Sequence, residues 1–131
     1  MDLLIGGRAQ GKLALALQRH PDISVLDENA SLTKLKNQKQ ECWIWNHFHL
    51  FVKARLAEGM DVQNLREFVL GILEECPNVI IISDEIGNGI VPMVKEERLW
   101  REETGRLLCK IAEHAENVER VICGIPVKIK E

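Results

Sequence analysis

A strand, a glycine-bounded turn and a helix follow one another at the start of the chain, and this order constrains the fold more than any other feature. Residues 3–5 (Leu-Leu-Ile) form a short apolar run that is typical of a buried strand. The turn Gly6-Gly-Arg-Ala-Gln-Gly11 follows, and Lys12 opens an amphipathic helix that extends to about Arg19. Gly-x4-Gly-Lys between a strand and a helix is the spacing of a phosphate-binding loop.

The chemistry of this turn favours an anion. Glycines let successive backbone N–H groups point toward phosphate oxygens, and the unpaired N–H groups and the dipole of a helix start attract negative charge. Lys12, which we expect at the surface of the loop, adds a mobile positive charge. We therefore predict that ATP or GTP binds through Gly6, Gly7, Arg8, Ala9, Gln10, Gly11, Lys12 and Leu13. A glycine-rich turn followed by a chance lysine is the competing interpretation.

One position departs from the pattern. The residue after the lysine is normally Ser or Thr, whose hydroxyl binds Mg²⁺. Leu13 has no oxygen to offer. Binding of Mg²⁺ must therefore depend on other groups, or be weak, or be absent.

A second predicted strand ends in two carboxylates. Residues 79–82 (Val-Ile-Ile-Ile) are apolar, as in a parallel strand that is buried on both faces. Asp84 and Glu85 follow at its end. Beside a phosphate loop this is similar to a Walker B element, in which an acid such as Asp84 holds Mg²⁺ and a neighbour orients or deprotonates an acceptor. An ordinary acidic turn is the alternative. The glycines of segment 86–92 are compatible with a loop that shapes a ligand pocket or with a tight turn.

Helical and strand patterns alternate along the rest of the chain, which predicts an α/β fold. A strand at 23–26 completes a βαβ unit with the first strand and helix. We predict further helices at about 43–58, 62–76 and 96–117, a strand at 118–123, and an alternating tail at 127–130 with one face buried. Gly105 lies inside the longest predicted helix and predicts that this helix packs closely against another helix. Segment 30–42 is compatible with a helix or a loop, and residues 27–29 favour a polar turn over a contact with metal or substrate.

Two histidines lie in the aromatic segment that begins at Trp43. His47 and His49 are two positions apart, so on a helix they face different sides and are poor joint ligands for a metal. Each histidine is expected either to be hydrogen-bonded within the protein or to be exposed to solvent. That one of them faces a ligand is the alternative.

Composition limits the class of protein. The 131 residues predict one domain, and the net charge of −3 argues against a general affinity for nucleic acid or anionic membranes. No apolar run approaches the roughly 20 residues that span a bilayer, and no secretory signal is visible. The four cysteines form no C-x-x-C pair, so we expect buried free thiols in a cytoplasmic protein.

Three segments resemble the adenosylcobinamide kinase / adenosylcobinamide-phosphate guanylyltransferase family of cobalamin biosynthesis. These are the loop at residues 6–12, the motif Ser83-Asp-Glu-Ile-Gly-Asn-Gly-Ile-Val-Pro92, and the ending Val121-Ile-Cys-Gly-Ile-Pro-Val-Lys-Ile-Lys130. The resemblance implies a P-loop NTPase-like, three-layer α/β fold with a small, mostly parallel sheet. It also implies a corrinoid substrate and a possible homo-oligomer.

The family phosphorylates a hydroxyl of adenosylcobinamide with ATP or GTP and then transfers GMP from GTP through a histidine. Lys12 maps to its phosphate loop and Glu85 to the glutamate of its second motif. The expected catalytic residues are thus Lys12, Asp84, Glu85 and His47, with Asp84 as the metal ligand. This chain is shorter than the family between the strand at 23–26 and residue 60, where the family carries its nucleotide-accepting histidine. A nucleotide-binding protein without turnover, and a kinase for another small alcohol, are the alternatives.

Overall fold

The computed structural model describes residues 1–39, 41–86 and 94–130, and these contain one six-stranded sheet. The strand order is β2-β3-β4-β1-β5-β6. Their bounds are Asp2–Gly6 (β1), Ser24–Leu26 (β2), Trp43–Trp45 (β3), Val79–Asp84 (β4), Asn117–Ile122 (β5) and Ile125–Lys130 (β6). The first five are parallel and β6 returns antiparallel beside β5. The predicted α/β fold with a mostly parallel sheet is confirmed.

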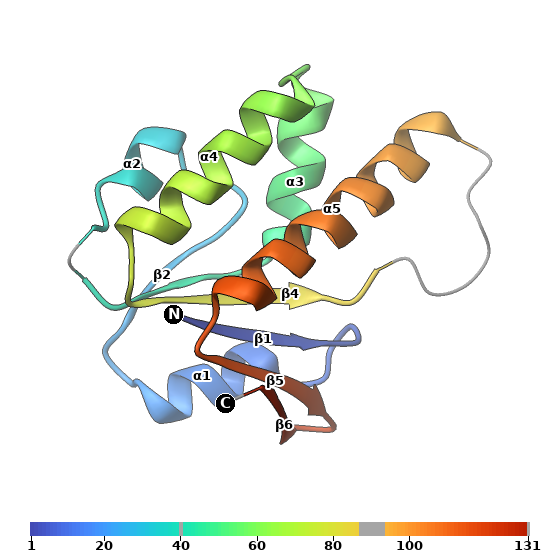
Figure 1. The fold of residues 1–131 in the computed structure, drawn as a ribbon. Helices are drawn as coiled ribbons and strands as arrows, with labels where there is room; N and C mark the ends of the chain where they lie inside the picture. Colours follow the sequence, from blue (N-terminus) through green and yellow to red (C-terminus); the bar gives the residue numbers. More distant parts are fainter. Residues whose placement is uncertain (40, 87–93, 131) are drawn as a thin grey trace.

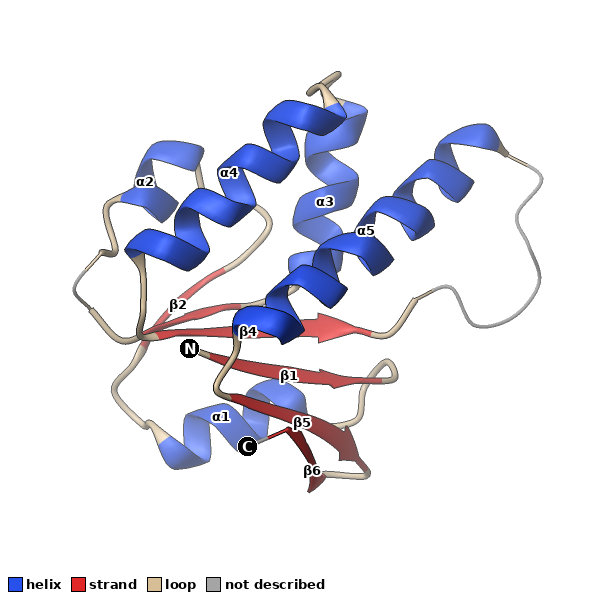
Figure 2. Cartoon of the chain, viewed as in Figure 1, coloured by secondary structure: helices blue, strands red, loops and turns tan. Residues whose placement is uncertain are grey.

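Helices cover both faces of the sheet and give it three layers. Helix α1 (Lys12–Arg19) lies against one face. The opposite face carries α2 (Leu32–Lys36), α3 (Phe48–Ala57), α4 (Val62–Glu75) and α5 (Lys95–His114), as Figures 1 and 2 show. None of the described helices is long and apolar enough to cross a membrane.

The apolar residues of the strands divide into two cores because successive side chains point to opposite faces. Leu4, Ile80 and Ile82 pack with Ala16 of α1. Leu3, by contrast, belongs to the larger cluster under α3, α4 and α5. Arg19 at the end of α1 makes a bidentate pair with Glu119 of β5, with nitrogen–oxygen distances of 2.6 and 3.0 Å. Hydrogen bonding to this guanidinium lowers the pKa of the Glu119 carboxyl. The pair fixes α1, and with it the loop that precedes α1, to the sheet.

The prediction of a helix beginning at 43 was wrong in its first part. Trp43, Ile44 and Trp45 form β3, and the helix begins only at Phe48. All three strand residues have 0% of their surface exposed. In a short, continuously apolar segment, the period of the hydrophobic residues does not distinguish a central strand from a buried helix. The correction matters because residues 46–49 then follow the carboxyl end of a parallel strand.

Smaller expectations were also corrected. Gly105 has open space where a Cβ would stand, so it does not mark close packing. On the last helix the apolar residue Leu99 is 39% exposed, whereas the charged residue Glu103 is buried. Only Cys76 among the four free cysteines is buried. The tail forms β6, but five of its six residues are exposed and the sixth is half-buried, so neither face is covered.

Of the two segments left open by the sequence, the structure resolves one. Segment 30–42 contains the short helix α2, which Ser31 caps by accepting a hydrogen bond from the backbone N–H of Lys34 at 3.1 Å. The expectation for the glycine-containing loop 86–92 lies outside the described residues, apart from Ile86.

Candidate active site

The turn between β1 and α1 has the backbone of a rigid anion-binding loop. Gly11 precedes the helix with φ of +87°, a conformation that glycine adopts without strain. A Cβ on Gly6 would lie 2.5 Å from the carbonyl oxygen of Val121, so only glycine fits where β1 leaves the sheet. Gln10 anchors the loop to the β5–β6 turn, since its backbone and side-chain oxygens accept hydrogen bonds from Gly124 and Cys123 at 2.8 and 2.6 Å. None of the backbone N–H groups of residues 7–13 donates a hydrogen bond to another described residue.

Lys12 lies inside this loop rather than on its surface, which corrects the expectation for it. The residue is 6% exposed. Its ammonium nitrogen is 2.6 Å from the carbonyl oxygen of Gly7, 3.4 Å from that of Gly6, and 2.8 Å from Oδ1 of Asp84. The strand register explains the last contact: Gly6 at the end of β1 is opposite Asp84 at the end of β4. The two strand ends thus bring the predicted cation and the predicted metal ligand together.

His49, in the first turn of α3, contacts the same carboxylate from the other side. Its Nδ1 accepts a hydrogen bond from the backbone N–H of Asp84 at 3.1 Å, and its Nε2 lies 3.4 Å from Oδ2. Burial of the imidazole lowers the pKa of His49, and the negative charge of Asp84 opposes that shift. The lowered pKa favours the neutral form of this ring.

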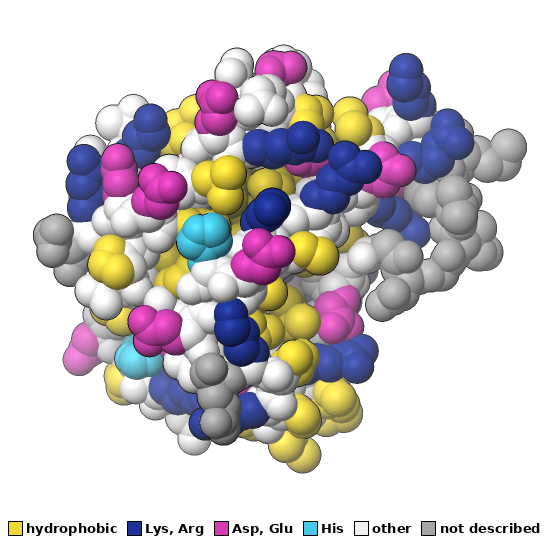
Figure 3. All heavy atoms as spheres, in the orientation of Figure 1, with side chains coloured by type: hydrophobic (Ala, Val, Ile, Leu, Met, Phe, Trp, Pro, Cys, Tyr) yellow, Lys and Arg dark blue, Asp and Glu magenta, His cyan; other side chains and the backbone are white. Residues whose placement is uncertain are grey.

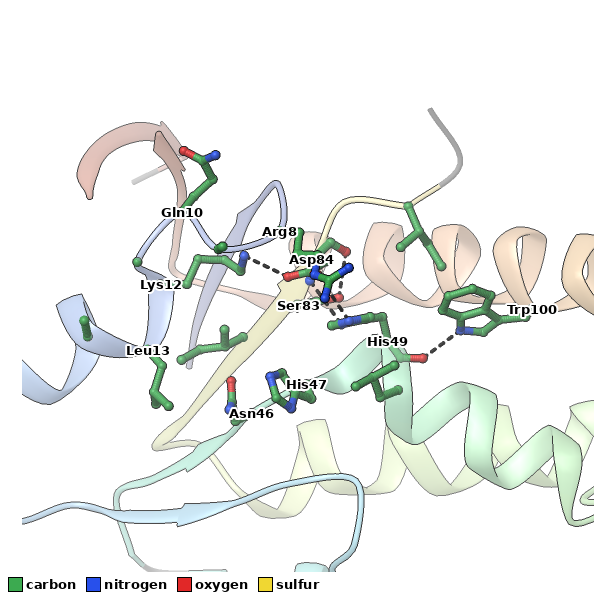
Figure 4. A pocket seen from close by; sticks show the side chains of 16 residues that line it. Arg8, Gln10, Lys12, Leu13, Asn46, His47, His49, Ser83, Asp84 and Trp100 are labelled. Atoms are coloured by element: carbon green, nitrogen blue, oxygen red, sulfur yellow. Dashed lines mark hydrogen bonds and ion pairs between the residues drawn. The ribbon is translucent and has the colours of Figure 1, made fainter. Parts of the chain in front are cut away.

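A cavity of about 580 Å³ opens beside these groups. The loop from Arg8 to Ala14 forms one wall, and the ends of β3 and β4 supply Asn46, His47, Ser83 and Asp84. Leu50, Ile86 and Trp100 add apolar side chains to its lining. Figure 4 shows Lys12 and His49 approaching Asp84 from opposite sides. The cavity therefore combines charged groups with apolar side chains.

His47 lies at the rim of the cavity and is paired with an acid. Its Nδ1 is 3.1 Å from Oε2 of Glu28. The contact follows from the sheet register, since Leu26 and Trp45 are opposite one another, and Glu28 and His47 each lie two residues beyond these strand ends. His47 also holds a left-handed backbone with φ of +55°. Such conformations in bulky residues are uncommon and gather at functional sites.

Glu85 is not brought into this cavity. Its carboxylate pairs with Arg120 at 2.9 Å and lines a separate cleft on the β5 side of the loop, together with Gly7, Gln10 and Cys123. Of the four expected catalytic residues, the structure gathers Lys12, Asp84 and His47 around one cavity and places Glu85 behind the phosphate loop.

A sequence model of the family described as cobinamide kinase / cobinamide phosphate guanyltransferase matches residues 3–129. The chain belongs to this family. Its members use nucleotides, which agrees with the phosphate loop and the cavity beside it.

Curated relatives match over part of their length. The bifunctional adenosylcobalamin biosynthesis protein CobP of Pseudomonas aeruginosa is 38% identical over 66 residues, which are 50% of this chain and 38% of that protein. The CobU proteins of Salmonella typhimurium and Escherichia coli are 35% identical over 65 residues and 36% identical over 75. These alignments cover 49% and 56% of this chain, and 36% and 39% of the two CobU proteins.

Two residues of this cobinamide kinase family member were undervalued in the sequence. His49 is predicted only as one of two histidines on a helix, and for Glu28 a polar turn is favoured over a contact with metal or substrate. Asp27 does make such a turn, since its Oδ1 accepts a hydrogen bond from Asn29 at 2.8 Å. The signal that identifies both residues is the end of a short parallel strand, because ligands of open α/β sheets bind beyond the carboxyl ends of strands. The strand that ends before Glu28 is predicted, whereas the prediction of a helix over Trp43–Trp45 hides this signal for His49.

The donor set is compatible with Mg²⁺ only if a nucleotide supplies most ligands. Among the described residues no three His, Cys, Asp or Glu side chains cluster as a metal site. Mg²⁺ is commonly held by one or two carboxylates, phosphate oxygens and water. Asp84 is the carboxylate that the cavity offers for this role, and the ion would screen the negative charge of the phosphates.

Replacing Leu13 by serine tests how far the missing hydroxyl weakens this site. We expect Leu13→Ser to increase the ratio of nucleotide affinities measured with and without Mg²⁺, because the hydroxyl adds an oxygen ligand at the helix start. Calorimetric titration with GTP and ATP measures that ratio. Leu13→Ala is the matched control, since it removes the same side chain without adding oxygen. Equal ratios in the two variants would show that the metal is held elsewhere.

Proposed function

We propose that this chain is a nucleoside-triphosphate-dependent kinase that phosphorylates a hydroxyl of cobinamide or its adenosyl form. The observation that carries the proposal is the contact between Lys12 and Asp84 at the mouth of a loop with free backbone amides. Family membership supports the corrinoid acceptor.

Each part of the cavity has a role in this reaction. The loop amides and Lys12 bind the β- and γ-phosphates and neutralise the charge that develops on the transferred group. Asp84 faces the same point and would hold a Mg²⁺ ion bound to the phosphates. The apolar side chains of Leu50, Ile86 and Trp100 exclude water from the place where the acceptor enters. The acceptor oxygen attacks the γ-phosphorus, the nucleoside diphosphate leaves, and the hydroxyl proton passes to a nearby base or to water.

A nucleotide-binding protein without turnover is the second candidate, and Leu13 favours it. Loop amides and Lys12 can hold phosphates without a metal ion, whereas phosphoryl transfer depends more heavily on charge neutralisation. Nucleotide affinity that does not depend on Mg²⁺, together with no phosphorylated corrinoid, would identify this alternative. Transfer to other small alcohols but not to cobinamide would identify a kinase of different specificity.

Removing the ammonium of Lys12 should abolish most nucleotide binding. We expect Lys12→Met to weaken GTP and ATP binding by about 30- to 150-fold, the size of a lost charge-assisted contact of about 2–3 kcal/mol. Calorimetry measures affinity, and chromatographic detection of cobinamide phosphate measures transfer. Lys110→Met is the control, because Lys110 is an exposed lysine on α5. Unchanged affinity in Lys12→Met would contradict the assignment of the loop.

The substitution also leaves the Asp84 carboxylate without its cation, so folding must be checked. The double variant Lys12→Met/Asp84→Asn removes both charges and should recover thermal stability that the single variant loses. It should not recover nucleotide affinity. This separates loss of binding from loss of fold.

We further propose that His47 accepts GMP in a second, guanylyl-transfer reaction. Glu28 occupies Nδ1 of the imidazole, which leaves the lone pair of Nε2 for the α-phosphorus of GTP. Attack there forms a nitrogen–phosphorus bond and releases pyrophosphate. An oxygen of cobinamide phosphate then attacks the same phosphorus and releases the histidine.

Labelling with GTP that carries radioactive α-phosphorus tests this step. We expect acid-labile label on the wild-type protein, none on His47→Asn, and less on Glu28→Gln because the ring loses its orienting partner. His114→Asn is the control, since His114 is exposed at the end of α5. Label that persists on His47→Asn, or its absence from wild-type protein that binds GTP, would exclude His47 as the acceptor.

We propose that the chain forms a homo-oligomer through its β5–β6 hairpin. Ile122, Ile125, Val127 and Ile129 are 48–64% exposed there, and apolar side chains gather over this hairpin in Figure 3. Strand β6 is also the sheet edge, whose outer backbone groups can pair with another chain.

The predicted cytoplasmic location stays a proposal; free thiols at all four cysteines are consistent with it.

A charge on the hairpin should dissociate this assembly. We expect light scattering to give an oligomer for the wild type and a monomer for Ile125→Lys, because burial of an unpaired ammonium is costly. Leu99→Lys, which places the same charge on an exposed residue of α5, should leave the oligomer intact. A monomeric wild type throughout the micromolar range would refute the proposal.

A further inference from the structure

His49 makes two contacts with one residue of β4, and the chemistry of the ring assigns them different roles. A backbone N–H is only a donor, so the Nδ1 that it contacts is the unprotonated nitrogen. The proton of the neutral ring is then on Nε2, 3.4 Å from Oδ2 of Asp84. The same imidazole thus accepts from the main chain of Asp84 and offers a donor to its carboxylate.

The ring is held firmly enough to orient its partner. His49 is 5% exposed, and its carbonyl oxygen accepts a hydrogen bond from Nε1 of Trp100 at 2.7 Å, which ties the start of α3 to α5. The ring of His47 packs edge-on against it with centroids 5.8 Å apart. Fixed on these sides, the imidazole has little freedom to follow a rotation of the carboxylate.

Asp84 needs such a partner in this chain. One of its oxygens, Oδ1, is 2.8 Å from the Lys12 ammonium. A serine or threonine after the lysine would add a polar group beside that carboxylate, but Leu13 cannot. With Oδ2 facing His49 and the backbone N–H held by the same ring, the orientation that turns Oδ1 toward Lys12 is selected.

We propose that His49 is a positioning residue of the phosphate site, which holds the Asp84 carboxylate in the orientation that faces Lys12 and the nucleotide. This inference rests on the proposed function of the cavity. A histidine that only satisfies a buried backbone N–H is the competing explanation. That role needs Nδ1 alone, whereas the positioning role needs Nε2 as well.

Two substitutions separate the nitrogens. The side-chain oxygen of asparagine stands where Nδ1 does, so His49→Asn keeps the acceptor for the backbone N–H and loses the donor to the carboxylate. The amide of glutamine extends to the place of Nε2, so His49→Gln keeps the donor and loses the short-range acceptor. We expect His49→Asn to weaken GTP and ATP binding by about tenfold, as for other groups that orient a functional ligand. His49→Gln should bind more tightly than His49→Asn.

Calorimetry with each nucleotide in the presence of Mg²⁺ gives the affinities, and thermal unfolding reports the fold. His114→Asn and His114→Gln are matched controls on an exposed histidine and should bind as the wild type does. Wild-type affinity in His49→Asn overturns the proposal. The proposal is also overturned if His49→Gln binds nucleotide no more tightly than His49→Asn does. The affinities would then depend on keeping the Nδ1 acceptor rather than the Nε2 donor.

Nitrogen-15 NMR of the histidine rings in the wild-type protein tests the same arrangement without any nucleotide. Above about pH 7.5, where imidazoles are neutral, the His49 ring should carry its proton on Nε2. A proton on Nδ1 overturns the proposal, even if both variants fail to fold. If the wild type binds no nucleotide, the proposed function fails, and the proton position still decides whether His49 is arranged to hold Asp84.

Discussion

The ion pair between Lys12 and Asp84 couples the phosphate loop to the strand beside it. It forms because β4 lies next to β1 with Asp84 opposite Gly6, so the turn that leaves one strand meets the carboxylate that ends the other. The carbonyl oxygens of Gly6 and Gly7 complete the surroundings of the ammonium. Both charges are largely withdrawn from water, and each is tolerated there because the other is present. The strand order therefore determines the chemistry of the cavity.

Much of the fold could be predicted from local pattern. The apolar run of β4 and the strand–turn–helix at the chain start follow rules of period and turn chemistry that act over a few residues. Trp43–Trp45 was misread because its neighbours, β2 and β4, come from distant segments that bury it on both faces. A short strand of this kind is defined by its partners rather than by its own sequence. The uncovered faces of β6 were unpredictable for the same reason.

The site was predicted where a motif spans neighbouring residues and missed where contacts are distant. Lys12 and Asp84 were identified from two such motifs, although the buried position of Lys12 depends on carbonyl groups that no motif reveals. Glu85 follows Asp84 directly, yet it pairs with Arg120 of β5 behind the loop. Successive residues of an extended chain point to opposite sides, and Asp84 and Glu85 accordingly line different cavities here.

Leu13 lacks the hydroxyl that usually follows the lysine of a phosphate loop, and other elements supply polar groups near this position. A helix start that lacks a hydroxyl can contribute only its amides and its lysine, so further polar groups have to come from elsewhere. In this chain they come from the carboxyl ends of β2, β3 and β4, as Glu28, His47 and Asp84, with His49 following in α3. Leu26 and Trp45 are paired in the sheet, and Glu28 and His47 each follow two residues later. These two side chains therefore meet although 19 positions separate them in the sequence. The polar side chains of this site thus lie at the ends of neighbouring strands, where the sheet itself fixes the spacing between them.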